Sequence, residues 1–310
     1  FQMALEWHEK ALTIYRTLTD KLGIAFALIS LGAAAVYQGN YAHARLLLEE
    51  SLNLSREVGD KWHIAAALNN LGFAAMYEGD YTRARLLLEE SLTLSREVGD
   101  KSQMADALAN LGVDEALQGN YDQGSIFLEE GLVLAREMED VRSVALGLHN
   151  LGDVARHQGD SARAASLLEE CLGLAQELGE RWLIALTLQI LGLIARENCD
   201  WERAGSLLNA GLKQSAEIGE KQLVAHCLES SAGLATVLRD PERAARLFGA
   251  AEELRRVIQA PIPPIDRTEY EADIAALHEQ FDETAFSSAW GKGRQMTMEQ
   301  AVAYALGDLT

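Results

Sequence analysis

Residues 46–60 read LLLEESLNLSREVGD and residues 86–100 read LLLEESLTLSREVGD, so two stretches forty residues apart differ only at Asn53 and Thr93. A catalytic site needs one arrangement of unlike residues. A repeated structural unit needs the same pattern of core and surface positions each time. The near-copy therefore predicts a chain built from stacked repeats.

Three markers recur at this period of forty residues. Leu-Gly stands at 31, 71, 111, 151 and 191; Gly-Asn/Asp stands before an aromatic residue at 39, 79 and 119; and a Gly-Asp/Glu-Lys/Arg triplet begins at 59, 99, 179 and 219. These markers predict six units over residues 21–260. Residues 4–12 align with residues 44–52, so we expect residues 1–20 to form the second helix of a truncated unit.

The sequence of one unit predicts two helices. Asp60 is a good helix N-cap, and apolar residues follow it at Ile64, Leu68 and Leu71, the spacing of one helix face. Gly79 ends this helix, and a second helix runs to the glycine at 99. Neither helix can bury its apolar face alone. In the copied stretch we expect the leucines to point inward, and the residues Glu49, Glu50, Glu89 and Arg56 to point to solvent.

Composition narrows the class of function. The chain has 310 residues, 48% of them hydrophobic, and a net charge of −20 with a pI near 4.7. Such a surface repels nucleic acids and anionic membranes, and we expect neither as a partner. No apolar run reaches the roughly 18–20 residues of a membrane span. Cys171, Cys199 and Cys227 form no CxxC pair and are typical of reduced residues in a cytoplasmic protein.

The sequence offers no convincing catalytic or cofactor motif. WGKGR at 290–294 contains Gly-Lys-Gly, but Phe286 stands where a phosphate-binding loop needs its first glycine. His149, Asp153 and His157 share one helix face, but about 12 Å of helix separates the outer two, too far for one metal ion. We therefore expect no enzymatic activity, no cofactor and no metal, and interpret these three residues as a polar surface.

Unit three breaks the pattern with Asp114 and Glu115, where other units have small or apolar residues. A carboxylate in a packed position is costly unless it is paired or reaches water. Gly124 and Gly131 replace larger residues nearby, and we expect them to make room for Glu115. Two interpretations stay open: a structurally paired acid, or a weak point linked to ligand binding.

The unit resembles the tetratricopeptide repeat (TPR) in a longer, forty-residue form. The positions that match the family pattern are Leu68, Leu71, Gly72, Ala75, Gly79, Tyr81 and Ala84. The usual proline at the unit junction is absent, and Gly99-Asp100 takes its place. The resemblance implies an all-α, right-handed superhelix of helical hairpins. In that fold the first helix of each pair lines a concave groove that binds peptides, proteins or small effectors.

Carrying the family's ligand-facing positions onto this chain gives an apolar half and a polar half of the groove. The apolar half includes Phe26, Phe73, Met76 and Tyr77, and the recurring asparagines are Asn70, Asn110 and Asn150. The polar half is His149, Asp153, Arg156, His157, Gln189 and Arg196. The lysines of the carboxylate-clamp subtype are missing, which argues against capture of a peptide C-terminus.

Residues 261–310 should form three short helices that cap the array, the last with a Thr297–Gln300 capping box. This tail looks like the end of large bacterial regulators: signal-transduction ATPases with numerous domains (STAND), or large LuxR-type activators. The resemblance implies an effector sensor that relieves autoinhibition of a nucleotide-binding switch upstream in the same chain. The alternative is a constitutive TPR adaptor. The helix in residues 1–20, with Leu5, Leu12 and Tyr15 left open, could also mediate self-association.

Overall fold

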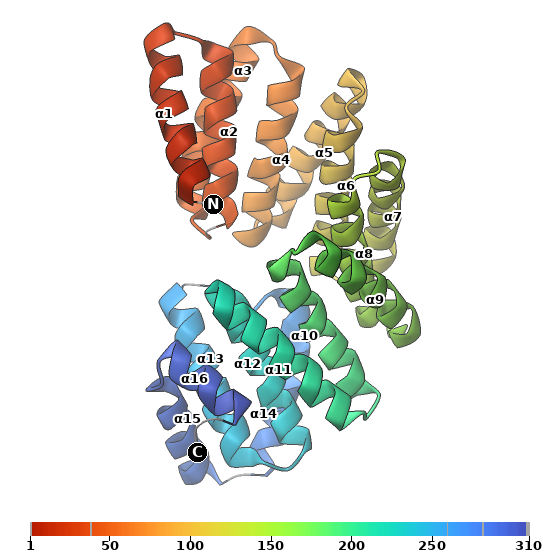
Figure 1. Ribbon diagram of the computed structural model, residues 1–310, viewed down its shortest axis with the longest axis vertical. Coiled ribbons are helices and arrows are strands. Elements are labelled where there is room, and N and C mark those ends of the chain that lie inside the picture. Colours follow the sequence, from red (N-terminus) through yellow and green to blue (C-terminus); the bar gives the residue numbers. More distant parts are fainter. Residues whose placement is uncertain (1, 38, 259, 281, 308–310) are drawn as a thin grey trace. The chain divides into compact units, whose positions relative to one another are not determined.

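The computed structural model describes residues 2–37, 39–258, 260–280 and 282–307, and within these ranges every regular element is a helix (Figure 1). Successive helices pair as hairpins, which confirms the predicted all-α class. The chain divides into two compact structural units, each larger than one repeat, which are called unit 1 (residues 1–150) and unit 2 (residues 151–310) from here on. Helix α8 (Val141–His157) contributes to both.

The remaining helices follow the forty-residue period up to residue 258. Unit 1 contains α1 (Gln2–Leu18), α2 (Lys21–Tyr37), α3 (Tyr41–Val58), α4 (Lys61–Tyr77), α5 (Tyr81–Val98), α6 (Lys101–Leu117) and α7 (Tyr121–Glu137). Unit 2 contains α9 (Ser161–Leu178), α10 (Arg181–Glu197), α11 (Trp201–Ile218), α12 (Lys221–Val237), α13 (Pro241–Ile258), α14 (Pro264–His278), α15 (Glu283–Arg294) and α16 (Met298–Leu306).

Many helix ends in the array are set by a glycine followed by an acidic cap. Gly59 has φ 78°, and its N–H donates to the carbonyls of Ser55 and Arg56 at the end of α3. The Asp60 carboxylate then accepts a hydrogen bond from the His63 N–H at 2.9 Å, which starts α4. Glycine adopts this left-handed conformation without strain, so the Gly-Asp pair gives a sharp turn between helices.

A second class of glycine brings paired helices together. A Cβ on Gly72 of α4 would lie 2.6 Å from Leu88 Cγ of α5, and Gly32 and Gly112 meet Leu48 and Leu128 in the same way. The leucine thus occupies the space that a side chain on the glycine would need. The buried Ser91 hydroxyl adds a hydrogen bond of 2.8 Å to the Ala65 carbonyl, and Ser51 repeats it on Ala25 at 2.9 Å.

The copied stretch has both an inward and an outward leucine face. Leu48, Leu52, Leu88 and Leu92 are buried as expected. Leu46 and Leu86, however, are 67% and 64% exposed, so the expectation that all these leucines point inward was wrong. The first leucine of the stretch lies two residues before the buried one, about 200° around the helix, and therefore on the opposite face.

The charged residues of the copied stretch link neighbouring helices. Arg16–Glu50, Arg56–Glu90 and Arg96–Glu130 are ion pairs of 2.8, 3.0 and 2.9 Å that join α1 to α3, α3 to α5 and α5 to α7. Lys61 pairs with Glu97 at 2.9 Å within one hairpin. The side chains are about half exposed, so each pair contributes little stability, but together they fix the same register at every step.

Helix α1 packs on α2 rather than presenting an open face at the expected residues. Leu12 is buried against Leu28 and Leu31, and Leu5 and Tyr15 pack at the edge of this cluster. The prediction that Leu5, Leu12 and Tyr15 are left open was therefore wrong. Large exposed apolar residues of α1 are Trp7, Ile14 and Leu18. Self-association through this helix stays a prediction, now carried by that second set.

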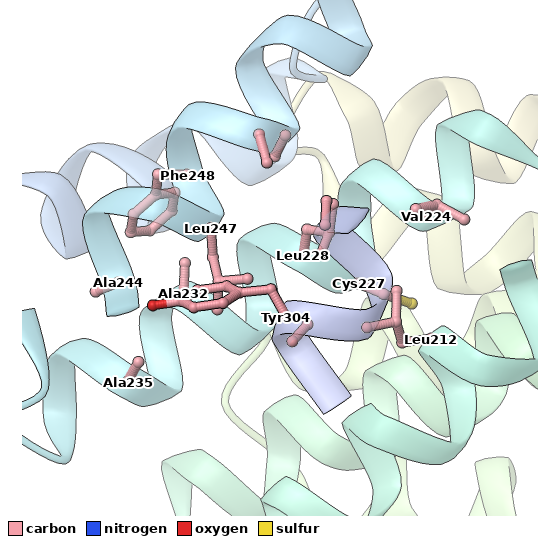
Figure 2. Packing of buried hydrophobic residues seen from close by; sticks show 14 of the residues in the cluster. Leu212, Val224, Cys227, Leu228, Ala232, Ala235, Ala244, Leu247, Phe248 and Tyr304 are labelled. Atoms are coloured by element: carbon pink, nitrogen blue, oxygen red, sulfur yellow. The ribbon is translucent and has the colours of Figure 1, made fainter. Parts of the chain in front are cut away.

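Helices α14, α15 and α16 follow α13 and cover its apolar surface. Tyr304 of α16 lies among Leu228, Leu247 and other residues of α12 and α13 (Figure 2). A Cβ on Gly293 would overlap the Arg246 carbonyl, so the backbones of α15 and α13 touch. The capping box of Thr297 and Gln300 is present at the start of α16.

Candidate functional site

The aromatic positions predicted for the groove divide between core and surface. Met76 is buried in the core, and Phe73 packs against two core clusters with its ring 4.9 Å from that of Tyr77. Tyr77 also stacks on Tyr41 at 5.7 Å. Phe26 and Tyr77 are both 44% exposed. Of Phe26, Phe73 and Tyr77, the first and the last present the larger surface.

A row of rings at the start of α4 was missed by the sequence analysis. The Phe26 ring lies edge-on to His63 at 6.5 Å, and Trp62 packs on His63 at 4.9 Å. The Trp62 indole N–H donates to the Asp100 carboxylate at 2.7 Å. A signal was present in the sequence, because the position of Trp62 is occupied by Ser102 and Arg142 in the next two repeats, although Trp182 restores the tryptophan.

The asparagine positions make hydrogen bonds within the protein. The Asn70 side-chain amide donates to the Ala66 carbonyl at 2.9 Å, and that of Asn110 donates to Asn69 Oδ1 at 3.1 Å. The second bond links α4 to α6, so it holds two first helices of neighbouring pairs in place. Asn150 is half-buried, and His149 is buried.

Asp114 and Glu115, the acidic residues that interrupt the repeat pattern, form a buried cluster with polar side chains. Glu115 pairs with Arg85 Nη1 at 2.6 Å and accepts 2.8 Å from the Asn120 amide. Asn120 therefore makes no side-chain cap bond to α7, unlike the equivalent Asp80 of α5. The Asp114 carboxylate accepts 2.9 Å from Gln118 through Oδ2, while Oδ1 is buried with no hydrogen-bond partner among the described residues.

The cluster has an electrostatic cost, and the nearby glycines do not relieve it as expected. Burial, with a smaller effect from the Glu115 charge, raises the pKa of Asp114 to about 6. A Cβ on Gly124 would lie 2.8 Å from the Gly112 carbonyl, and one on Gly131 would lie 3.2 Å from the Ala105 carbonyl. Both glycines therefore allow α7 to approach the α6 backbone. The expectation that they make room for Glu115 was wrong.

In unit 2, two predicted site residues meet on one acidic side chain. Arg156 of α8 and Arg196 of α10 both donate to Glu269 of α14, Arg156 at 3.1 Å. Arg196 also donates to Asp273 of α14 at 2.7 Å, and Arg156 to Glu197 at 3.0 Å. The two arginine side chains are only 5% and 10% exposed. Helix α14 thus covers the polar positions, a contact that the sequence analysis missed.

The remaining predicted polar residues surround this contact or lie deeper. Asp153 is 3.6 Å from both Arg156 Nε and His157 Nε2, and burial lowers the pKa of His157. Gln189 is buried and donates 2.9 Å to Ser230, between α10 and α12. Among the described residues, no group of three or more His, Cys, Asp or Glu is placed to hold a metal ion. In the same part of the chain, no helix is long and apolar enough to cross a membrane.

A family profile described as tetratricopeptide repeat matches residues 1–57, 63–137 and 103–177, together more than half of the chain. No curated protein matches. Among solved structures, the chain is similar to a Rap protein complexed with competence and sporulation factor (TM-score 0.68, 12% identity, 92% of this chain and 76% of that one). The apo form of RapI is also similar (TM-score 0.67, 15% identity, 83% and 92%).

A further similar structure is a STAND protein with a tetratricopeptide repeat sensor from Pyrococcus horikoshii, with a TM-score of 0.60 and 17% identity. The match covers 94% of this chain but 45% of that protein, so the chain spans less than half the length of this relative. At these identities the similar structures show the fold. Together with the profile match and the helical pairs at a period of forty residues, they establish that the chain belongs to the tetratricopeptide repeat family.

Proposed function

We propose that this chain is the effector-binding or protein-binding sensor region of a larger bacterial signalling ATPase or transcription regulator, located in the cytoplasm. The first helices of the pairs recognise an effector, a peptide, a protein or a small molecule. Binding relieves autoinhibition of a nucleotide-binding switch that lies upstream in the same protein. The chain itself performs no reaction, because its specialised residues form a recognition surface rather than a catalytic arrangement.

One observation carries the proposal: exposed residues that differ between repeats lie on first helices, whereas the copied Arg–Glu pairs lie on second helices. Arg56–Glu90 and Arg96–Glu130 are the same ion pair in successive units, so a ligand would find the same pattern at each step. Phe26 and Tyr77 are exposed on first helices. Ala66 and Asp106 take the place of Phe26 in the next two repeats, and Leu117 and His157 take the place of Tyr77. Specific recognition needs such differences.

Two similar structures support the proposal through what they are named for. One is a Rap protein in complex with competence and sporulation factor, and the other is a STAND protein whose tetratricopeptide repeats are called a sensor. Both have this fold at low sequence identity. They support a sensor role here without identifying its effector.

The proposal is tested by selecting ligands from a random dodecapeptide library displayed on phage, with the full chain immobilised. We expect enriched peptides to bind wild type and to lose at least about tenfold in affinity, roughly 1.4 kcal/mol, with Phe26→Ala or Tyr77→Ala. Thermal melting of both variants confirms that they remain folded. Fluorescence anisotropy with each synthetic peptide gives the dissociation constants.

The matched controls are on α5, the second helix of the repeat that contains Tyr77. Glu89→Gln removes a copied charge, and Leu86→Gln removes an exposed apolar side chain. Both should leave peptide affinity unchanged. If the selected peptides lose affinity with these controls and keep it with the Phe26 and Tyr77 variants, recognition occurs on the second helices and the proposal is wrong.

A further inference from the structure

Within unit 2, helix α14 contacts α8 and α10 through a compact set of charges. The Glu269 carboxylate bridges Arg156 and Arg196, one oxygen to each, and Asp273 accepts a second bond from Arg196. A single carboxylate held by two nearly buried guanidinium groups is a strong and directional contact. The first helices α8 and α10 therefore present a carboxylate-binding site, to which α14 supplies the carboxylates.

The next first helix, α12, is shaped for the same contact. A Cβ on Gly233 would overlap both Arg196 Nη1 and Asp273 Oδ2. The equivalent positions in other pairs are filled by larger side chains, Phe73, Val113 and Leu193 among them. The glycine at 233 is therefore the residue that lets the Arg196–Asp273 pair lie against the α12 backbone.

The connection into α14 is also held by residues special to the last pair. Arg255 of α13 forms a bidentate ion pair with Glu229 of α12, at 2.5 and 2.7 Å. It also donates to the carbonyls of Ala260 and Pro261, both at 3.3 Å. The equivalent residues are small, such as Ser55 and Ser95. Arg255 thus directs the chain after α13 toward the arginines of α8 and α10.

The charges supplied by α14 fit the two arginines incompletely. The Nε atom of Arg156 is buried with no hydrogen-bond partner in the described part of the chain. Asp266 is held in the same region, where burial and the negative charge of Asp153 raise its pKa to about 7. Asp153 and Glu197 also face Arg156, so acidic groups outnumber the two guanidinium groups at this contact. Arg156 Nε reaches only the Asp153 carboxylate, at 3.6 Å, which is too long for a hydrogen bond. An occupant with a better match of charges would compete with it.

We propose that Arg156 and Arg196 form a binding site for an acidic amphipathic helix of a partner protein, and that α14 is the chain's own occupant of this site. The inference rests on the proposed function, because it assigns a partner to the same first-helix surface. Its chemistry is that of α14: two carboxylates four residues apart on one face, beside apolar residues such as Tyr270, Ile274 and Leu277. The partner helix binds when α14 leaves.

The test uses a fluorescein-labelled synthetic peptide of residues 262–280 and the full chain. Glu269→Gln with Asp273→Asn weakens the chain's own α14 contact and keeps both arginines. We expect this double variant to bind the peptide at least about tenfold more tightly than wild type, because the tethered competitor is lost. Adding Arg156→Gln and Arg196→Gln should remove that gain. A peptide carrying Glu269→Gln and Asp273→Asn should bind no protein tightly.

Hydrogen–deuterium exchange of residues 265–277 reports directly whether α14 leaves. Protection should fall in the double variant, and in wild type when excess peptide is added. Gly233→Ala provides a second route, because it keeps every charged residue and crowds the Arg196–Asp273 pair. It should also lower α14 protection and raise peptide affinity, so the test does not depend on one variant folding.

Several results would overturn the inference. Unchanged α14 protection in both variants makes the helix a permanent part of the fold. Peptide binding that ignores the arginines places the site elsewhere. Concentration-dependent dimers that exchange α14 make a second copy, rather than a partner protein, the occupant. The peptide-library experiment tests Phe26 and Tyr77 in unit 1 and does not involve α14. Failure of the α14 experiment therefore leaves the proposed function unaffected, and failure of the peptide-library experiment contradicts the proposed function alone.

Discussion

Cys199 holds a backbone conformation that glycine holds in earlier units. Its φ is 60°, and the equivalent Gly79, Gly119 and Gly159 have φ between 80° and 83°. An L-residue pays roughly 1–2 kcal/mol in this left-handed region, while glycine costs about 0.4–1 kcal/mol through the unfolded state. We expect Cys199→Gly to stabilise the chain by about 0.5–1 kcal/mol, measured by urea unfolding.

Gly159→Ala is the matched control for this prediction. A Cβ there would meet no heavy atom within 4 Å, so the substitution tests the backbone alone. It should destabilise the chain by about 1 kcal/mol. If Cys199→Gly lowers stability instead, the cysteine side chain makes a contact worth more than the backbone strain.

The buried Asp114 predicts a pH dependence with a definite sign. Its pKa is raised from 3.8 to about 6, so the folded state holds this proton more tightly than the unfolded state. The stability it supports is complete below the unfolded pKa and is lost as pH rises through about 6. Asp114→Asn stays neutral and should be more stable than wild type at pH 8, by about 1–3 kcal/mol, with the gap closing toward pH 4.

Melting temperatures of the two proteins measured in parallel from pH 4 to pH 8 decide the matter. The charged neighbours of Asp114 are Glu115 and Arg85, and both are unchanged in the variant. Subtracting one curve from the other therefore cancels the groups that titrate elsewhere, such as the half-buried His226, whose pKa is lowered to about 3 by desolvation of its ring. A gap that does not vary with pH would mean that Asp114 titrates normally.

At the scale of one helix, the two leucines of the copied stretch make opposite predictions. Leu88 is fully buried against Gly72, whereas Leu86 is 64% exposed on the same helix. Leu88→Ala opens a cavity and should cost about 2–5 kcal/mol. Leu86→Ala should change stability by less than about 0.5 kcal/mol. Chemical unfolding of the pair measures both, and similar losses would contradict the assigned helix face.

The sequence predicted the helices well because their signals are local. Gly59 and Asp60 are consecutive in the sequence, and together they form the turn between α3 and α4, the helices directly before and after them. The prediction that every leucine of the copied stretch points inward was wrong for Leu46. That prediction used the residue type alone, whereas the angular position around the helix determines which face a leucine lies on. Angular position is also local, so this error could have been avoided from the sequence.

The contact of Arg156 and Arg196 with α14 could not be predicted from such local signals. Arg156 and Glu269 are 113 residues apart, and Glu269 lies outside the periodic region that relates one unit to the next. Periodicity locates Arg156 and Arg196 on first helices, but it gives no information about a helix that follows the array. The small side chain at Gly233 was the available signal, and its meaning depends on knowing that α14 lies above it.

At the scale of the whole chain, the tail helices protect an apolar surface. Leu228, Leu247 and Phe248 are buried in one cluster with Tyr304 of α16 (Figure 2). Leu277 of α14 and Ala289 of α15 belong to the same cluster. A chain ending at residue 258 should expose this cluster, bind the dye ANS and melt at a lower temperature. A double substitution, Leu228→Ser with Leu247→Ser, in the shortened chain should reduce dye binding. A shortened chain that melts as the full one does would contradict the capping role.

One set of ion pairs and serine bonds in unit 1 joins residues 34, 36 or 26 apart, and each of these repeats forty residues later. Suppose the gene lost the codons for residues 47–86. Arg16 would then meet Glu90 at the same separation at which it now meets Glu50, and Ser91 would reach Ala25 as Ser51 does. Near-identical stretches are also where unequal crossing-over occurs. The array can therefore gain or lose whole units in one recombination event, and its length is open to selection independently of its folding.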